Sequence, residues 1–337
     1  MQFVKMHGLG NDFVIVSHDQ LDNLDISSIA SNISNRNTGI GCDQFIVYKV
    51  SEVLASLRGG QSPTWQSHFN DREIATDASV LAMTNANDHE IHQCQIWIYN
   101  NDGSLAGACG NATRCMMKLL YMEYGIEHVE LDVLGRKLAC RVLSDDKFEA
   151  NMGKVSFDEA WMPESEKIWD VVRECVGRFA SLRGGQSPTW QSHFNNREIA
   201  TSLNAPRNDV FPVQALACAD IGNRHLVLFV DEMTDDEKWI LGEKMEHGGS
   251  LFTTGVNVSL ARVMNGHIEL KVWERQVGFT QACGSGACVT VAAAIKLGFV
   301  NDKVEVHFSS GILDISMKDG EMYMAGPATF VGRGEVI

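Results

Sequence analysis

The stretches Ala108-Cys109-Gly110-Asn111 and Ala282-Cys283-Gly284-Ser285 each open an apolar run of helical length. These runs predict helices over 111–124 and 285–297, each ending near a glycine. The second run is apolar on nearly every side, which is typical of a helix wrapped by a sheet. A polar loop that contains a glycine precedes each cysteine, so the two halves of the chain look related.

Outside these helices, short runs rich in β-branched and aromatic residues predict strands. An amphipathic helix is predicted on the outside at Asp235–His247. We expect an α/β (α+β) protein of two pseudo-symmetric domains, each a mixed, curled β-sheet around a central helix. The first domain is expected over 1–151 plus 327–337, and the second over 152–326. The strand runs are 2–6, 13–16, 45–48, 95–99, 129–133, 136–142, 256–262, 267–273, 304–308 and 312–317.

A repeat of a different kind interrupts both halves. Ala55–Thr76 and Ala180–Thr201 match at every position except Asp71 against Asn196. One sequence can hardly suit two different core environments, and both copies are rich in turn formers. We therefore expect inserted surface loops at about 55–90 and 180–210. The fold can accept such long loops because the entropic cost of closing a loop grows slowly with its length. A duplicated peptide-binding segment is the alternative.

The charge and composition exclude several classes of partner. The 337-residue chain carries 28 basic and 43 acidic residues, a formal charge of −15 at pH 7. This charge repels phosphate backbones and anionic surfaces, so neither nucleic acid nor a membrane is an expected partner. No apolar run reaches the roughly 18 residues of a membrane span, and no signal peptide is evident. We expect a cytoplasmic protein.

The nine cysteines contain no C-x-x-C pair, so their spacing fits neither a disulfide scaffold nor a zinc site. Reduced thiols and no metal are expected. At a helix start, Cys109 and Cys283 would lie beside free N–H groups and the positive end of the helix dipole, which favours the thiolate. Two such thiols suggest an acid and a base that face each other across one carbon atom. Gly110 and Gly284 would let the backbone come close to a ligand.

The sequence resembles the diaminopimelate epimerase family over the whole chain outside the two inserts. Two positions depart from the family pattern: Ala112 stands in place of a glycine, and Arg224 in place of a proline, which leaves the shape of its loop open. The motifs that carry the resemblance follow the family's order and are MHGLGNDF (6–13), GIGCDQ (39–44), NDGS (101–104), ACGNATRC (108–115), GNRH (222–225), GVN (255–257), WER (273–275) and CGSGAC (283–288).

The resemblance implies a fold of that family and a cofactor-independent interconversion of LL- and meso-2,6-diaminopimelate, in lysine and peptidoglycan precursor synthesis. It also implies a homodimer. Inverting a carbon beside a carboxylate without a cofactor needs two bases, which Cys109 and Cys283 would supply. The implied substrate-binding residues are Asn11, Gln44, Asn100, Gly110, Asn111, Asn223, Asn257, Glu274, Arg275, Gly284 and Ser285, with His225 in support.

The resemblance assigns different roles to the residues of this set. Asn11, Asn100, Asn223, Asn257 and Arg275 would hold the distal amino and carboxylate groups, while Gln44, His225 and Glu274 would line the reacting centre. Backbone donors at the two helix starts would hold the α-carboxylate.

Two other functions remain open. A proline or hydroxyproline racemase of the same fold is the nearest enzyme, although Arg275 and the asparagines favour a substrate with a second zwitterionic end. The other reading is an inactive thiol redox or binding protein, in which Cys109 and Cys283 join as a disulfide on oxidation.

Overall fold

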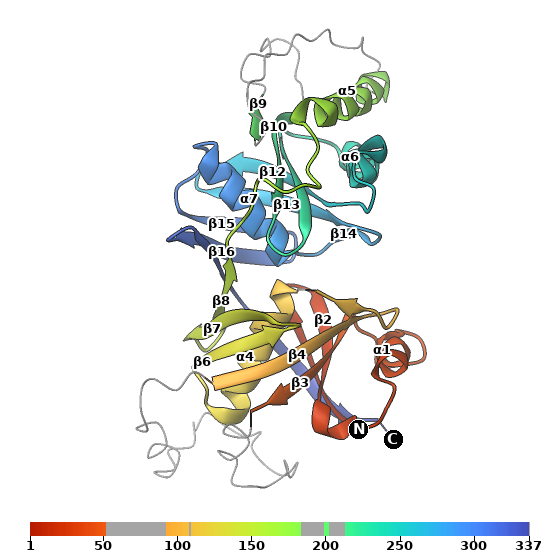
Figure 1. Ribbon diagram of the computed structural model, residues 1–337, viewed down its shortest axis with the longest axis vertical. Helices are drawn as coiled ribbons and strands as arrows, with labels where there is room; N and C mark the ends of the chain where they lie inside the picture. Colours follow the sequence, from red (N-terminus) through yellow and green to blue (C-terminus); the bar gives the residue numbers. More distant parts are fainter. Residues whose placement is uncertain (52–91, 108, 183–198, 202–212, 337) are drawn as a thin grey trace.

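The structure is a computed structural model that describes residues 1–51, 92–107, 109–182, 199–201 and 213–336. Figure 1 shows two halves stacked along the long axis, with both chain termini in the lower half. Each half is a curled sheet around one helix, α4 in the lower half and α7 in the upper half. Within the described ranges, no helix is long and apolar enough to cross a membrane.

The first half wraps its sheet around α4 (Gly110–Tyr124). Neighbouring strands pair antiparallel, except that β2 with β3 and β4 with β6 are parallel. Helix α1 (Ile26–Ser34) packs on β3 and β4, and a short 3-10 helix η1 (His18–Gln20) follows β2. The strands are β1 (Gln2–Gly8), β2 (Asn11–Ser17), β3 (Gln44–Val50), β4 (His92–Asn100), β5 (Leu105–Ala106), β6 (His128–Val133), β7 (Arg136–Ser144) and β8 (Lys147–Gly153).

The second half repeats this connectivity around α7 (Gly284–Lys296). Its parallel pairs are β11 with β12 and β13 with β15, the counterparts of those in the first half. Helices α5 (Ser165–Leu182) and α6 (Asp235–His247) and the 3-10 helix η2 (Gly248–Ser250) pack on one another beside the sheet. The strands are β10 (Val213–Asp220), β11 (Arg224–Val230), β12 (Asn257–Met264), β13 (His267–Glu274), β14 (Gly278–Thr280), β15 (Lys303–Phe308), β16 (Gly311–Lys318) and β17 (Glu321–Gly326).

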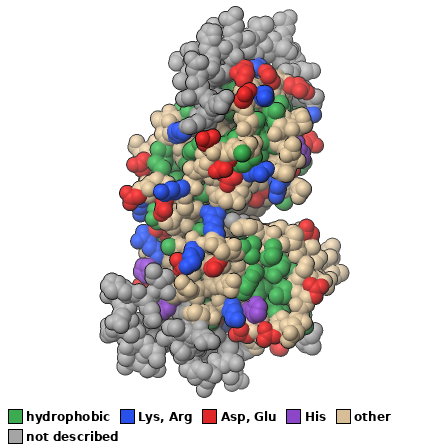
Figure 2. Space-filling view, viewed as in Figure 1, with side chains coloured by type: hydrophobic (Ala, Val, Ile, Leu, Met, Phe, Trp, Pro, Cys, Tyr) green, Lys and Arg blue, Asp and Glu red, His purple; other side chains and the backbone are tan. Residues whose placement is uncertain are grey.

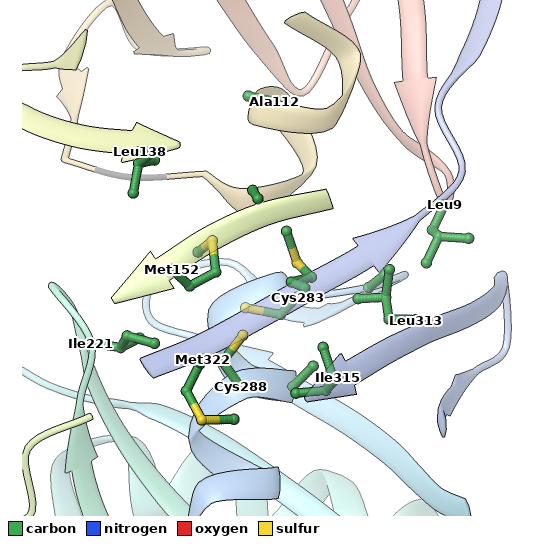
Figure 3. Close-up of a cluster of buried hydrophobic side chains, with 14 of the residues drawn as sticks. Leu9, Ala112, Leu138, Met152, Ile221, Cys283, Cys288, Leu313, Ile315 and Met322 are labelled. Atoms are coloured by element: carbon green, nitrogen blue, oxygen red, sulfur yellow. The ribbon is translucent and has the colours of Figure 1, made fainter. Parts of the chain in front are cut away.

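The two halves are joined through their sheets and through a common core. β8 of the first half pairs with β17 of the second, and β18 (Thr329–Glu335) crosses back to pair with β1. Buried apolar side chains from both halves form one continuous cluster that includes Leu9, Met152 and Cys283. Figure 3 shows this cluster around Cys283 at the junction.

The expected fold class is confirmed, and the helices at 111–124, 235–247 and 285–297 are found within one residue of their predicted bounds. Gly125 ends α4 in the left-handed conformation, with φ 68°, as predicted. The exact division into two domains stays a prediction. The first insert lies outside the described residues.

The second insert is described only at residues 180–182 and 199–201, and neither segment is a loop. Residues 180–182 continue α5, and β9 (Ile199–Thr201) pairs with β10. The expectation of a surface loop is therefore wrong for these two short segments. β10 pairs with β11 on its other side, so β9 covers an edge that would otherwise present free N–H and C=O groups.

Candidate active site

Cys109 and Cys283 occupy the same position in the two halves, immediately before α4 and α7. Both are N-cap residues with an extended backbone, at φ −148° and ψ 106° for Cys109 and φ −128° and ψ 110° for Cys283. Their carbonyl groups accept hydrogen bonds from Thr113 N–H at 3.2 Å and Ala287 N–H at 3.0 Å. Cys109 is partly exposed and Cys283 is buried. Each side chain lies beside the free N–H groups of a helix start.

The two helix starts meet at Met324 of β17. A Cβ on Gly284 would lie 2.6 Å from Met324 Sδ and 3.4 Å from Gly110 Cα, and a Cβ on Gly110 would lie 2.9 Å from Met324 Cε. These glycines, which we expected to approach a ligand, are thus also needed for packing between the halves. The approach brings the Cys109 and Cys283 thiols within electrostatic reach of each other.

Burial dominates the protonation of both thiols. It raises the pKa of Cys109 to about 11 and the pKa of Cys283 well above its ordinary value, and the nearby Glu274 carboxylate raises both further. Helix N–H groups act in the opposite direction on each sulfur, as does the Ser285 hydroxyl on Cys283. The helix starts alone therefore do not create the resting thiolate that we expected from the sequence.

The Ser285 hydroxyl joins the polar side chains around Cys283. Its Oγ lies 3.4 Å from Cys283 Sγ and 3.1 Å from Nε2 of His225, and it accepts a hydrogen bond from Asn223 Nδ2 at 3.1 Å. Asn257 Nδ2 lies 3.5 Å from the same His225 nitrogen. Burial lowers the pKa of His225 to about 3, so this imidazole is neutral.

Glu274 ends β13 and is the acidic group that influences both cysteines. Its Oε1 accepts a hydrogen bond from Thr280 Oγ1 at 2.6 Å, and the Cys283 thiol is a second partner of the carboxylate. Burial raises the pKa of Glu274, and Asp43 of the first half raises it further. Glu274 therefore lies where the two halves face each other.

Arg275 follows Glu274 and is exposed. Its backbone N–H donates to Asn257 Oδ1 at 2.9 Å, and its guanidinium donates to Thr254 O at 3.0 Å. The side chain thus lies at the rim of the site and not beside the cysteines.

Gln44 and Asn100 form the matching arrangement in the first half. Gln44 opens β3 and pairs in register with Asn100 at the end of β4, and Gln44 Nε2 donates to Asn100 Oδ1 at 3.1 Å. Asn257 and Glu274 occupy the equivalent places at the start of β12 and the end of β13. Because β2 and β3 are parallel, Asn11 at the start of β2 lies at the same sheet edge as Gln44.

Three side-chain oxygens of the predicted set are buried without a hydrogen-bond partner among the described residues. They are Asn11 Oδ1, Gln44 Oε1 and Asn223 Oδ1. Buried acceptors are nearly always bonded in folded proteins, and leaving one unpaired costs about 1–3 kcal/mol. Amide oxygens are suitable acceptors for an ammonium group. The unpaired oxygens therefore point to a ligand that brings hydrogen-bond donors.

Arg114 is a residue of the site that the sequence analysis missed. It is fully buried, and its guanidinium donates to Asn111 Oδ1 at 2.8 Å, Pro327 O at 3.2 Å and Gly110 O at 3.4 Å. Asn111 Nδ2 in turn donates to Ala282 O at 3.1 Å, so the chain of bonds runs from one helix start to the other. The sequence offered only its place in the helix expected at the centre of the first domain.

The predicted residues therefore fall into a connected group and a rim. The side chain of Asn111 is hydrogen-bonded to Arg114 and Ala282, so its backbone N–H is the group that remains for a ligand. Within the described ranges, no three His, Cys, Asp or Glu side chains converge as metal ligands would. The group at the helix starts comprises Cys109, Gly110, Asn111, Asn223, His225, Asn257, Glu274, Cys283, Gly284 and Ser285; Asn11, Gln44, Asn100 and Arg275 lie around it.

Solved structures share this fold at low sequence identity. A phenazine biosynthesis protein of the PhzF family from Bacillus anthracis superposes with a TM-score of 0.61 at 11% identity, covering 100% of this chain and 99% of that one. A hydroxyproline epimerase from Agrobacterium vitis, with bound trans-4-hydroxy-L-proline, superposes with a TM-score of 0.54 at 12% identity, covering 100% and 90%. Likeness at this level shows the fold alone.

Sequence comparison goes further. A family model described as diaminopimelate epimerase matches residues 3–157 and 217–331. Relatives named diaminopimelate epimerase from Rickettsia akari and Rickettsia felis are 38% and 37% identical over 336 residues, which covers 99% of this chain and 97% of each relative. The chain therefore belongs to the diaminopimelate epimerase family and is an isomerase of the epimerase class.

Proposed function

We propose that the chain interconverts LL- and meso-2,6-diaminopimelate by a two-base mechanism that uses Cys109 and Cys283 and no cofactor. The observation that carries this proposal is the meeting of the two cysteine-bearing helix starts at Met324. Two sulfurs so arranged can address the two faces of one α-carbon.

In the forward reaction, one cysteine acts as thiolate and removes the α-proton from one face. The electron pair of the broken C–H bond remains on the α-carbon, and the second thiol delivers its own proton to the opposite face. The first cysteine ends as a thiol and the second as a thiolate, so the reverse reaction starts from the product of the forward one. No other redox or group-transfer partner is required.

The raised pKa values suit this chemistry. A buried thiolate of high pKa is a stronger base, closer in strength to the weakly acidic α-carbon. The α-ammonium group of the substrate would stabilise the thiolate on binding, since an opposite charge nearby favours the ionised form. The N–H groups at both helix starts would hold the carboxylate as charge develops, at about 3–4 kcal/mol for each good donor.

The polar group around the cysteines favours a substrate with two zwitterionic ends. The unpaired oxygens of Asn11, Gln44 and Asn223 would accept from an ammonium group, and Arg275 would hold a carboxylate. Proline and hydroxyproline offer only one such end, so we propose diaminopimelate instead.

The family also informs the setting of the reaction. We propose a place in lysine and peptidoglycan precursor synthesis, a cytoplasmic location, a homodimer, and two domains over 1–151 plus 327–337 and 152–326. Figure 2 shows an indentation between the two halves, and closure of the halves on substrate would exclude water from the thiols.

The test is solvent exchange on the purified protein. LL-diaminopimelate in deuterium oxide should gain deuterium at the α-carbon and convert to the meso form, and Cys109→Ala or Cys283→Ala should each abolish conversion. Cys140→Ala, at another buried cysteine, should retain it. Full turnover in either active-site variant would refute the two-base mechanism, and turnover of proline but not diaminopimelate would refute the substrate.

A further inference from the structure

Arg224 departs from the family pattern and opens β11 between Asn223 and His225. Successive side chains of a strand point to opposite faces, so Arg224 points away from the face on which His225 contacts Ser285. Its guanidinium donates to Thr254 Oγ1 at 2.5 Å and lies over the Trp161 ring, 5.4 Å from its centroid. The side chain is thus held in one place by a hydroxyl and an aromatic face.

The same residue, Thr254, also holds the guanidinium of Arg275, through its carbonyl oxygen at 3.0 Å. The following Gly255, at φ 72°, has no room for a side chain, because a Cβ there would lie 2.9 Å from Arg275 Cδ. Two guanidinium groups therefore flank a single residue at the rim of the site, next to Asn223 and Asn257.

Neither of these cations has a carboxylate partner among the described residues. Asp220 lies opposite Arg224 in the β10–β11 register, but its oxygens accept from Gly222 N–H at 2.8 Å and Trp161 Nε1 at 3.2 Å. The acid thus anchors the tryptophan that supports Arg224. Two guanidinium groups that bond the same residue, with no carboxylate oxygen of the described residues hydrogen-bonded to either, favour binding of an anion there.

We propose that Arg224 is a specificity-determining residue that binds the distal carboxylate of the substrate together with Arg275. This rests on the proposed function, because a substrate with a second carboxylate supplies the anion. On binding, a carboxylate oxygen takes the place of Thr254 Oγ1 as acceptor for Arg224, and the Trp161 stack keeps the guanidinium at the rim.

The experiment separates binding from chemistry by using the full chain with Cys109→Ala and Cys283→Ala. Calorimetry gives the Kd of LL-diaminopimelate at several salt concentrations. Adding Arg224→Gln should raise Kd about tenfold and flatten its dependence on salt, because one screened charge is lost. Arg224→Lys should restore the salt dependence and part of the affinity. Arg262→Gln, which removes an arginine paired with Glu269 on the same half, should change neither.

L-Lysine is the matched ligand, since it is diaminopimelate without the distal carboxylate. Its weak binding should be the same with and without Arg224→Gln. Equal loss of affinity for both ligands would overturn the proposal, because Arg224 would then act through the shape of its loop. An unchanged Kd for diaminopimelate in Arg224→Gln, with a loss in Arg275→Gln, would overturn it and leave the proposed function standing. A parent protein that fails to bind diaminopimelate would overturn both.

Discussion

Burial decides the protonation of single residues in this site more than residue type does. His225 illustrates this, since it is fully buried among Ser285, Asn257 and apolar neighbours, and its pKa falls to about 3. An unperturbed histidine titrates near 6.5. His225 is therefore a neutral hydrogen-bonding group, and it does not shuttle protons near neutral pH.

This lowered pKa makes a prediction about stability. The folded state binds fewer protons than the unfolded state between pH 6.5 and about 3, so the stabilisation is present above pH 6.5 and is lost as pH falls. His225→Gln should therefore be less sensitive to acid, and the difference in unfolding free energy from the parent should shrink by up to about 1.4 kcal/mol per pH unit below 6.5. Urea unfolding of the parent and His225→Gln at pH 7.5 and 5.5 measures this difference in unfolding free energy.

His128→Gln, at an exposed position of β6, is the control for the loss of a histidine outside the site. Parallel curves for the parent and His225→Gln would show that burial does not lower the pKa of His225 in the folded protein.

Arg114 carries a second prediction at this scale. Arg114→Met would leave Asn111 Oδ1 without its buried donor, at about 1–3 kcal/mol for an unpaired group. It would also remove a charge that lowers the pKa of Cys109. We expect kcat to fall at least tenfold, and the limb of the pH profile of kcat/KM that reports the Cys109 thiol to move to higher pH.

Arg114→Lys keeps the charge and should restore the pH profile but only part of kcat, and Arg262→Met is the surface control. A variant that loses stability while its pH profile stays fixed would limit Arg114 to a structural role.

Some of these residue roles were readable from the sequence and others were not. Cys109 and Cys283 could be identified because two helix starts carried the same unusual residue. The burial of Arg114 could not, because arginine is mostly exposed and its partners, such as Pro327, lie far away in sequence. The packing of Gly110 against Met324 was hidden for the same reason.

At the scale of elements, the helices were easier to predict than several strands. α6 has a complete capping box at Thr234 and Glu237, a strong local start signal. By contrast, β11 (Arg224–Val230) is buried almost throughout, and its continuous apolar run does not distinguish a strand from a buried helix. Nothing local could indicate that β8 pairs with β17, since that contact joins the two halves.

Helix α6 also positions the loop that carries Glu274 and Arg275. The Glu246 carboxylate accepts hydrogen bonds from Trp273 Nε1 at 2.9 Å and from Gln276 N–H at 3.0 Å. The backbone carbonyl of Glu246 accepts a third from Val256 N–H at 2.9 Å. These contacts flank Arg275 on one side and Asn257 on the other. One residue of an outer helix thus holds two segments of the site.

Glu246→Gln tests this positioning role. The amide of glutamine keeps one acceptor oxygen but puts an NH2 donor in place of the other, opposite an N–H group. One hydrogen bond is therefore lost, which lowers the stability by about 1 kcal/mol. We expect KM for diaminopimelate to rise several-fold with kcat within twofold, because the cysteines are not displaced. Glu243→Gln, at an exposed position of the same helix, is the control. A fall in kcat with an unchanged KM would contradict the assignment.

For the whole molecule, the repeated connectivity explains why two half-sites face each other. Each half brings a strand start, a strand end and a helix start to one sheet edge, so Gln44, Asn100 and Cys109 correspond to Asn257, Glu274 and Cys283. The pairing of β8 with β17 then places the two edges in opposition. The sequence predicted the relationship between the halves, but the junction depends on long-range contacts.

The buried thiols outside the site have a consequence for stability in alkali. Burial raises the pKa of Cys94 and Cys115 in the first half, and of Cys218 and Cys288 in the second, to about 12 each. An unfolded cysteine titrates near 8.5. Above that pH the folded state keeps protons that the unfolded state has lost, so this stabilisation is complete below about pH 8.5 and disappears as pH rises toward 12.

We therefore expect the free energy of unfolding to fall steeply above about pH 9, by on the order of 1 kcal/mol per pH unit for each buried thiol. Urea unfolding at pH 8, 9 and 10 measures how steeply the unfolding free energy falls with pH. Cys218→Ala should make this fall less steep by the contribution of one buried thiol. Because one apolar cluster spans both halves, the loss should appear as a single transition and not as the early unfolding of one half. A free energy that stays constant from pH 8 to 10 would mean that these thiols reach water in the folded protein.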